Sequence, residues 1–207
     1  MLRTSSVSAR PRYVFQQAMN LLGAGLSDGD HDEDALSVKE AELSMLRRVG
    51  APEGHILVAQ GNLAGTYRAL GRLEEALRMR RDIYSECVRI HGEEHGETLH
   101  EAICYANALL NLNRFQEAKS LLRKMMPVAR RVLGESHELA LRMRWAYAVA
   151  LCNDPASTLD DLREAVTTLE ETERTTRRVF GGAHPLTEAI EHALQNAQAA
   201  LRARETE

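Results

Sequence analysis

The residue types best able to bind a metal ion or to act as a nucleophile are the eight histidines and three cysteines. His91 and His95, with Glu93 and Glu94 between them, have side chains of the kinds that bind zinc. A zinc site carried by one short segment needs a third ligand, however, and nothing in the sequence places one. His95 also recurs at a fixed spacing, which gives it a structural explanation. We therefore expect no metal ion and no other cofactor.

The sequence supports cysteine chemistry and the common catalytic motifs no better than it supports a zinc site. The cysteines, Cys87, Cys104 and Cys152, are an odd number without paired spacing, which is typical of reduced thiols in an intracellular protein. Cys104 and Cys152 fall within expected helices, where they are interpreted as small core or groove residues. The sequence has no phosphate-binding loop, Rossmann glycine pattern, nucleophile elbow or paired-carboxylate signature. We therefore expect that the chain is not an enzyme.

The glycines and histidines instead mark an internal repeat. Gly50, Gly92 and Gly134 are 42 residues apart, and Gly181 follows 47 residues later. Three of these glycines are followed at the same offset by a histidine: His95, His137 and His184. A second marker repeats with the same spacings of 42 and 47, at Ala76, Ala118 and Ala165. Because two independent markers agree on one five-residue insertion, the chain is interpreted as a tandem repeat.

Each repeat is predicted to contain two helices. In residues 72–91 and 114–133, apolar side chains recur every three or four positions, which is the spacing of one helix face. The stretches before them, 56–70 and 98–112, are rich in Ala and Leu and favour helix. Pro127 is expected to kink its helix without changing the assignment. The junction glycines suit the left-handed conformation that closes a helix.

The ends of the chain are less regular. Residues 13–22 and 33–49 look like a degenerate helix pair, and 185–201 like a single closing helix that begins at His184-Pro185. The five extra residues of the third period are 153–157, after which Ser157 and Asp160 resemble a capping box with Asp in place of Glu.

These patterns predict an all-α fold, a right-handed α-solenoid of about nine helices in antiparallel pairs. The low aromatic content of three Phe, one Trp and five Tyr in 207 residues argues against a β-sandwich or barrel. The expected organisation is a flexible basic tail at 1–11, a single array at 12–203 and a tail at 204–207. Within the array we expect a degenerate repeat at 12–50, repeats at 51–92, 93–134 and 135–181, and a closing helix at 182–203.

Part of the first complete repeat matches a known pattern. The matching residues are Gln60, Leu63, Ala64, Tyr67, Gly71, Leu73 and Ala76, with Gln60 in place of the usual Trp. They resemble the tetratricopeptide repeat signature. The period of 42 residues, the Gly-x-x-His junctions, Asn62-Leu63-Ala64 and the Gly-Arg-Leu-Glu-Glu-Ala of 71–76 resemble the longer repeats of kinesin light chains. The resemblance covers residues 50–200 well and 12–49 weakly.

The resemblance implies a scaffold that binds other proteins. The sequence departs from the kinesin-light-chain pattern, however, at several positions. Kinesin light chains often carry two consecutive Asn in the first helix, whereas Gly61-Asn62 keeps one and Trp145-Ala146 keeps none. No coiled-coil heptads precede the array. We therefore do not infer motor binding or the same cargo peptides.

In arrays of this kind the first helix of each pair lines the concave groove. The repeat register places amides, arginines, histidines and the single tryptophan there. The predicted peptide-binding residues are Arg68, His100, Asn107, Asn111, Arg142, Trp145, Asn153, His192 and Asn196. Amides pair with an extended backbone, arginines with carboxylates, and Trp provides an apolar anchor. This favours an extended or short helical peptide with acidic residues. The alternative is that Trp145 packs between helices and the polar side chains are simply solvated.

A basic segment at 114–144 carries eight Lys or Arg against three Glu, a net +5. It is interpreted as a solvated helix face complemented by the acidic segment 28–40 of its own or another chain, rather than as a site for nucleic acid or an anionic membrane. The net charge of −4 for the whole chain favours that interpretation.

The predicted function is a protein–protein interaction module or adaptor that binds a peptide segment in its groove. The alternative is a structural subunit packed permanently in a larger assembly. We expect a protein or peptide partner, no nucleic acid and no membrane span. The expected location is the cytoplasm. The alternative is an organelle, because the first 27 residues hold Arg3, Arg10 and Arg12 and no acidic residue.

Overall fold

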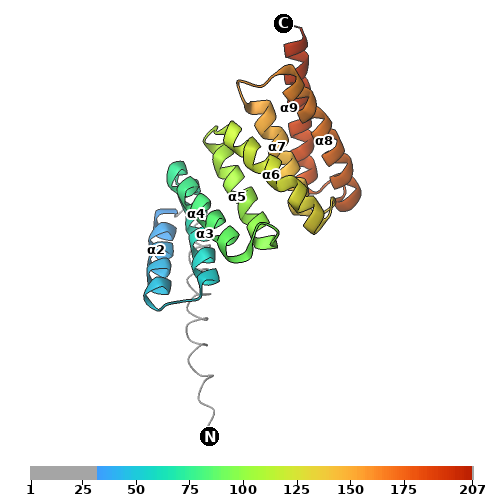
Figure 1. The fold of residues 1–207 in the computed structure, drawn as a ribbon. Coiled ribbons are helices and arrows are strands. Elements are labelled where there is room, and N and C mark those ends of the chain that lie inside the picture. The colour runs from blue at the N-terminus through green and yellow to red at the C-terminus, as the bar shows by residue number, and fades with distance from the viewer. Residues whose placement is uncertain (1–31, 207) are drawn as a thin grey trace. The chain divides into compact units, whose positions relative to one another are not determined.

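The computed structural model describes residues 32–206, which form eight helices and no strand (Figure 1). The helices are α2 (Asp32–Arg48), α3 (Glu53–Ala69), α4 (Leu73–His91), α5 (Gly96–Asn111), α6 (Phe115–Leu133), α7 (Glu138–Asn153), α8 (Leu159–Phe180) and α9 (Pro185–Glu205). The predicted all-α class is confirmed. The helix expected at 13–22 lies outside the described residues. Helix α6 continues through Pro127, as expected.

The chain divides into two compact units, with the boundary inside α4 between Ile83 and Tyr84. In the first unit α2 packs on α3. The core of this unit contains Leu36, Leu43, Leu46, Ala59 and Leu63.

Two ionisable side chains of α2 lie within this first unit as well. Lys39 is buried and donates a hydrogen bond to Thr66 Oγ1 at 2.6 Å. Glu42 is also buried and has no hydrogen-bond partner among the described residues. Because burial disfavours the charged carboxylate, it raises the pKa of Glu42, and the charge of Lys39 offsets part of that rise.

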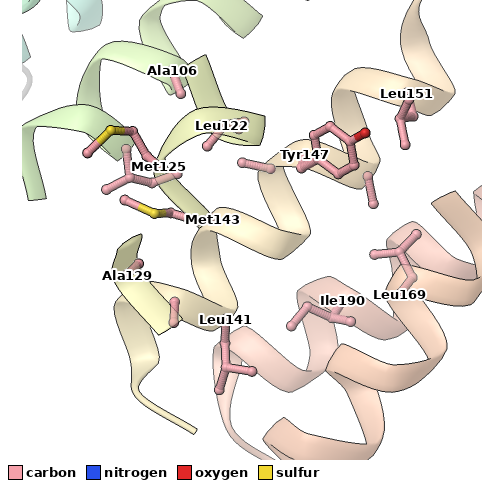
Figure 2. Close-up of a cluster of buried hydrophobic side chains, with 14 of the residues drawn as sticks. Ala106, Leu122, Met125, Ala129, Leu141, Met143, Tyr147, Leu151, Leu169 and Ile190 are labelled. Carbon is pink, nitrogen blue, oxygen red and sulfur yellow. The ribbon is translucent and has the colours of Figure 1, made fainter. Parts of the chain in front are cut away.

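In the second unit each helix from α5 to α9 packs on the next, and α7 also contacts α5 and α9. The core of this unit is formed largely by α7, whose Leu141, Met143, Tyr147 and Leu151 are fully or almost fully buried (Figure 2). Alanines fill much of the remaining core, because they allow helices to approach closely. This explains why so few aromatic side chains suffice.

The junction histidines that define the repeat are helix N-caps. His95, His137 and His184 precede α5, α7 and α9, and the Nδ1 atom of each accepts a hydrogen bond from the backbone N–H two residues later. The three N···N distances are 3.3, 3.2 and 3.2 Å. These bonds satisfy donors that the first turn of a helix leaves unpaired. The sequence showed the recurrence of these residues but not the role of the ring nitrogen.

The junction glycines behave as expected. Gly92, Gly134 and Gly181 have φ of +82°, +93° and +89°, a region that side chains with a Cβ rarely adopt. The N–H groups of these glycines bond to the carbonyl four residues earlier at 2.9–3.0 Å. The second helix of each of these repeats thus ends at a glycine, and the first helix of the following repeat is capped by a histidine.

The predicted capping box after the insertion is wrong by one residue. Thr158 and Asp161 form it: Asp161 N–H donates to Thr158 Oγ1 at 3.1 Å, and Thr158 N–H donates to Asp161 Oδ2 at 2.9 Å. Ser157 is instead buried, and its hydroxyl donates to the carbonyl of Leu151. The inward turn of Ser157 shifts the start of α8 to the next residue.

The insertion is anchored by a buried ion pair. Lys119 Nζ of α6 lies 2.8 Å from Asp154 Oδ2, with side chains only 9% and 7% exposed. Gln116 and the backbone N–H of Ala156 also donate to this carboxylate, at 2.6 and 3.0 Å. The hydrogen bonds from Lys119 and Ala156 lower the pKa of Asp154. The added residues are therefore tied to α6.

We predict that His137→Ala lowers the free energy of unfolding by about 1 kcal/mol, because the N-cap acceptor is lost. His137→Asn should restore most of this stability, since the Asn side chain supplies an oxygen acceptor. Urea denaturation followed by circular dichroism measures both. The control is His55→Ala, at an exposed position within α3, which should change stability by less than about 0.5 kcal/mol. An equal loss in His137→Asn and His137→Ala would contradict the capping role.

We predict that Asp154→Ala lowers the free energy of unfolding by about 3 kcal/mol, because the charge of Lys119 is left buried without a partner. This value is the lower end for a broken buried pair, since Asp154 borders a cavity that is partly open to solvent. Asp160→Ala removes an exposed carboxylate of the same loop, with a side chain 91% exposed, and should change stability by less than about 0.5 kcal/mol.

The same pair should make stability depend on acid pH. A carboxyl whose pKa is lowered on folding stabilises the protein above its unfolded pKa of about 3.9 and loses this effect as pH falls through the folded value. The difference in unfolding free energy between the wild type and Asp154→Asn should therefore be full at neutral pH and shrink below about pH 4. A difference that stays constant down to pH 2 would show that the charge of Asp154 is not what stabilises the loop.

Candidate binding site

A cavity of about 500 Å³ opens between α5 and α7, the first helices of two successive repeats. The lining residues are His100, Ile103, Cys104, Asn107, His137, Glu138, Leu139, Arg142 and Trp145. Residues three, four and seven positions apart share one face of a helix. On α5 such a set is His100, Ile103, Cys104 and Asn107, so the lining follows directly from the helical register.

Four predicted site residues meet in this cavity: His100, Asn107, Arg142 and Trp145. The polar members are exposed, whereas Trp145 is partly buried and packs against the core of the second unit. The Nε1 atom of Trp145 is buried and has no hydrogen-bond partner among the described residues. Trp145 thus combines the two interpretations given for it, because it packs between helices and also lines the cavity.

The remaining predicted residues lie elsewhere. Asn111 is the exposed last residue of α5. Asn153, the last residue of α7, borders a different cavity with Pro155 and Arg204. His192 and Asn196 are exposed on α9 and hydrogen-bond to each other at 3.3 Å. Arg68 belongs to the first unit, where it is exposed in the last turn of α3.

The charge in the cavity comes from three side chains. Hydrogen bonds to Cys104 and Glu101 raise the pKa of His100 to about 10, so its ring is positively charged at neutral pH. Arg142 Nη2 lies 2.7 Å from Glu138 Oε1, and both side chains are about half exposed. Both cations of the cavity are therefore already paired, His100 with Glu101 at 3.2 Å and Arg142 with Glu138, which the groove prediction did not include. The spacing of four residues between Glu138 and Arg142 was the signal that would have revealed the second pair.

The basic segment 114–144 is compensated within its own unit. Each of its eight cations lies beside an acceptor: Arg114 by Glu117, Lys119 by Asp154, Arg123 by the Tyr147 hydroxyl, Lys124 by Glu93, Arg130 by Glu135, Arg131 by Glu94, Arg142 by Glu138 and Arg144 by Glu171. The interpretation as a solvated, compensated face fits these pairs. These acceptors are neighbouring residues of the second unit.

Comparison with known proteins identifies repeats in part of the chain. The sequence model of the tetratricopeptide repeat matches residues 56–97 and 106–138. No curated protein sequence matches the chain. Among the helices of the described part of the chain, none is long and apolar enough to cross a membrane.

Solved structures of kinesin-light-chain-like proteins have the same fold. One is a variant of a putative kinesin light chain with nearly identical TPR-like repeats from Podosopora anserina, with a TM-score of 0.78, 20% identity and coverage of 97% of this chain and 92% of that chain. A second structure of that protein gives a TM-score of 0.74, 21% identity and coverage of 92% and 88%. BtubC (BKLC) from P. vanneervenii gives a TM-score of 0.72 at 14% identity, with coverage of 96% and 84%.

Tetratricopeptide repeats are stacked helix pairs that serve as scaffolds for contacts between proteins. The general class of function expected from the sequence, a protein–protein interaction module, is therefore supported. The family match covers two stretches of the chain, and the fold match extends over most of its length. The chain thus contains tetratricopeptide repeats within residues 56–97 and 106–138, and its fold is similar to that of solved kinesin-light-chain-like repeat structures.

Proposed function

We propose that the chain is an adaptor that binds a peptide segment of a partner protein in the cavity between α5 and α7. The observation that carries this proposal is the meeting of His100, Asn107, Arg142 and Trp145 in one cavity. These side chains come from two helices whose sequence positions differ by about one repeat. The cavity volume of about 500 Å³ suits one or two side chains of an extended peptide.

The lining supplies three kinds of contact. The amide of Asn107 can both donate to and accept from a peptide backbone. The partly buried ring of Trp145 offers an apolar contact next to a rigid core, which is the usual environment of an interface anchor. His100 and Arg142 carry positive charge toward the same space and attract a carboxylate. The favoured ligand therefore carries an acidic side chain beside an apolar one.

Glu138 limits this preference for acidic peptides. Its carboxylate pairs with Arg142 and also lines the cavity. An incoming carboxylate must replace Glu138 as the partner of Arg142, and it meets like charge while doing so. Selectivity for acidic ligands thus depends on the opposite charges of Glu138 and Arg142, which lie one helical turn apart on α7. Removing Glu138 should raise the affinity for acidic peptides, and removing Arg142 should lower it.

Residues beyond the cavity extend the proposed surface in the second unit. Asn111, Asn153, His192 and Asn196 are exposed and offer further hydrogen bonds to a peptide longer than the cavity. In the first unit, Arg68 offers the same carboxylate-binding chemistry on α3. We propose the four residues of the second unit as secondary contacts, because none of them lines the cavity that contains Trp145, and Arg68 as a separate contact of the first unit.

The test uses a fluorescein-labelled peptide of alternating Glu and Leu, with a Gln and Leu peptide for comparison. Arg142→Glu should weaken binding of the acidic peptide at least about tenfold, equivalent to about 1.4 kcal/mol. Glu138→Gln should strengthen it by about threefold, because the competing charge is removed while Arg142 is kept. Fluorescence anisotropy measures both constants.

Arg163→Glu is the matched control. Arg163 is a similarly exposed arginine, on α8, that pairs with a carboxylate three residues away and lies outside the cavity. It should leave the affinity within twofold. Equal losses in Arg142→Glu and Arg163→Glu would mean that only general charge attraction is measured. Unchanged affinity in Arg142→Glu would exclude this cavity as the acidic-peptide site.

A second candidate function is that of a structural subunit. Ile90, Val132 and Val179 each precede a junction glycine by two residues, and they are 38%, 40% and 44% exposed. Exposed apolar side chains repeated once per repeat are suited to permanent packing against another protein. The oligomeric state of the purified chain, measured by analytical ultracentrifugation, distinguishes the two functions. A monomer supports the adaptor, whereas self-association that is abolished by Val132→Glu/Val179→Glu supports the subunit.

A further inference from the structure

Three side chains of α5 converge beside the cavity and have the chemistry of metal ligands. His100 Nδ1 lies 3.2 Å from Glu101 Oε1 and 3.9 Å from Cys104 Sγ. One ligand atom from each of the three residues lies within 4.8 Å of the others. His100 and Cys104 also line the cavity, so an ion and its water can reach them from solvent.

The separations suit a tetrahedral ion. Bonds of about 2.0 Å to nitrogen and about 2.3 Å to sulfur place those two atoms about 3.5 Å apart around zinc. The observed 3.9 Å between Nδ1 and Sγ needs only a small rotation of either side chain. His100 and Cys104 are four residues apart on one helix, so both project from the same face. A thiolate, an imidazole and a carboxylate together favour zinc over the harder ions magnesium and calcium.

A second cluster, formed by His91, His95 and Glu97, is less suitable. Glu97 supplies the third ligand type that the sequence analysis could not place, with its Oε2 3.1 Å from His91 Nε2. The rings of His91 and His95 are stacked, however, with centroids 4.5 Å apart and planes inclined by only 20°. The lone pair of an imidazole nitrogen lies in the plane of its ring, so two stacked rings cannot aim at one ion. The Nδ1 atom of His95 is also engaged in capping α5.

The other two cysteines are in poorer positions. Cys87 is buried, and Cys152 borders a different cavity with no histidine in its lining. Burial raises the pKa of both thiols to about 11, which disfavours the thiolate form that binds metals. Among the three cysteines, Cys104 alone lies beside both an imidazole and a carboxylate in the described part of the chain.

We propose that His100, Glu101 and Cys104 bind one zinc ion in the wall of the cavity between α5 and α7. The three residues supply nitrogen, oxygen and sulfur ligands, and the fourth position faces the cavity, where water or a carboxylate of a bound peptide fills it. Zinc binds thiol and imidazole ligands in their deprotonated forms, so affinity rises with pH.

Cobalt(II) is the spectroscopic probe for this site, because a thiolate ligand gives it an intense near-ultraviolet charge-transfer band. Titration of the full chain with cobalt should give the band at one equivalent, and zinc should displace it. Cys104→Ser should abolish the band and weaken zinc binding at least tenfold, and His100→Ala should weaken it similarly. Cys104→His replaces the sulfur ligand with a nitrogen ligand, so this variant should still bind the metal but should not show the thiolate band. No peptide is present, so the outcome is independent of the proposed function.

The matched controls are Cys152→Ser and His91→Ala. Each should leave zinc affinity within twofold, with circular dichroism confirming that every variant is folded. The proposal is overturned if the wild type shows no thiolate band with cobalt, or if Cys104→Ser binds zinc as tightly as the wild type. It is also overturned if His91→Ala removes zinc binding, because the ion would then occupy the cluster of His91, His95 and Glu97.

Discussion

Burial of α7 on several sides is the constraint on which the second unit depends. This helix packs against α5, α6, α8 and α9, and eight of its sixteen residues are buried. Toward α5, a helix enclosed in this way can carry exposed polar side chains only on the narrow strip that its neighbours leave open. Glu138, Arg142 and Trp145 occupy that strip at spacings of four and three residues. The packing that stabilises the unit therefore also fixes which side chains of α7 face the cavity.

Tyr147 shows how the opposite side of α7 is tied to the same packing. Its ring is buried in the core, while its hydroxyl donates to Glu164 at 2.8 Å and accepts from Arg123 Nη2 at 2.7 Å. The hydroxyl thus links α6, α7 and α8. A network with all its members satisfied holds neighbouring helices in one register. The hydrogen bonds of Tyr147 to α6 and α8 thus hold α7 in place on the side away from the cavity. This limits how far Trp145 and Arg142 can shift when a ligand binds.

The helices of the repeat were predictable because their signals are local. Apolar spacing in 72–91 and 114–133 and the glycines at the ends of those segments gave α4 and α6 to within two residues. The meeting of His100, Asn107, Arg142 and Trp145 followed from register alone. The pairing of Glu138 with Arg142 is also a local signal, since the two residues are four positions apart on one helix. The prediction did not include it because groove residues were selected by side-chain type and not by their pairing. The position of the capping box was missed because it depends on Ser157 turning inward, which is a tertiary effect.

The two junctions of the second unit that lead into α5 and α7 show that the start of a repeat is encoded within a few residues. At Gly92 and Gly134 the glycine N–H bonds to the carbonyl four residues earlier and ends one helix, and His95 or His137 caps the next through the N–H two residues later. Duplication or loss of one 42-residue unit, at the level of the gene, would therefore leave a complete junction at each new boundary. Such an event changes the length of the array without new helix-ending or helix-starting residues, so the number of repeats can evolve separately from the ligand contacts on their first helices.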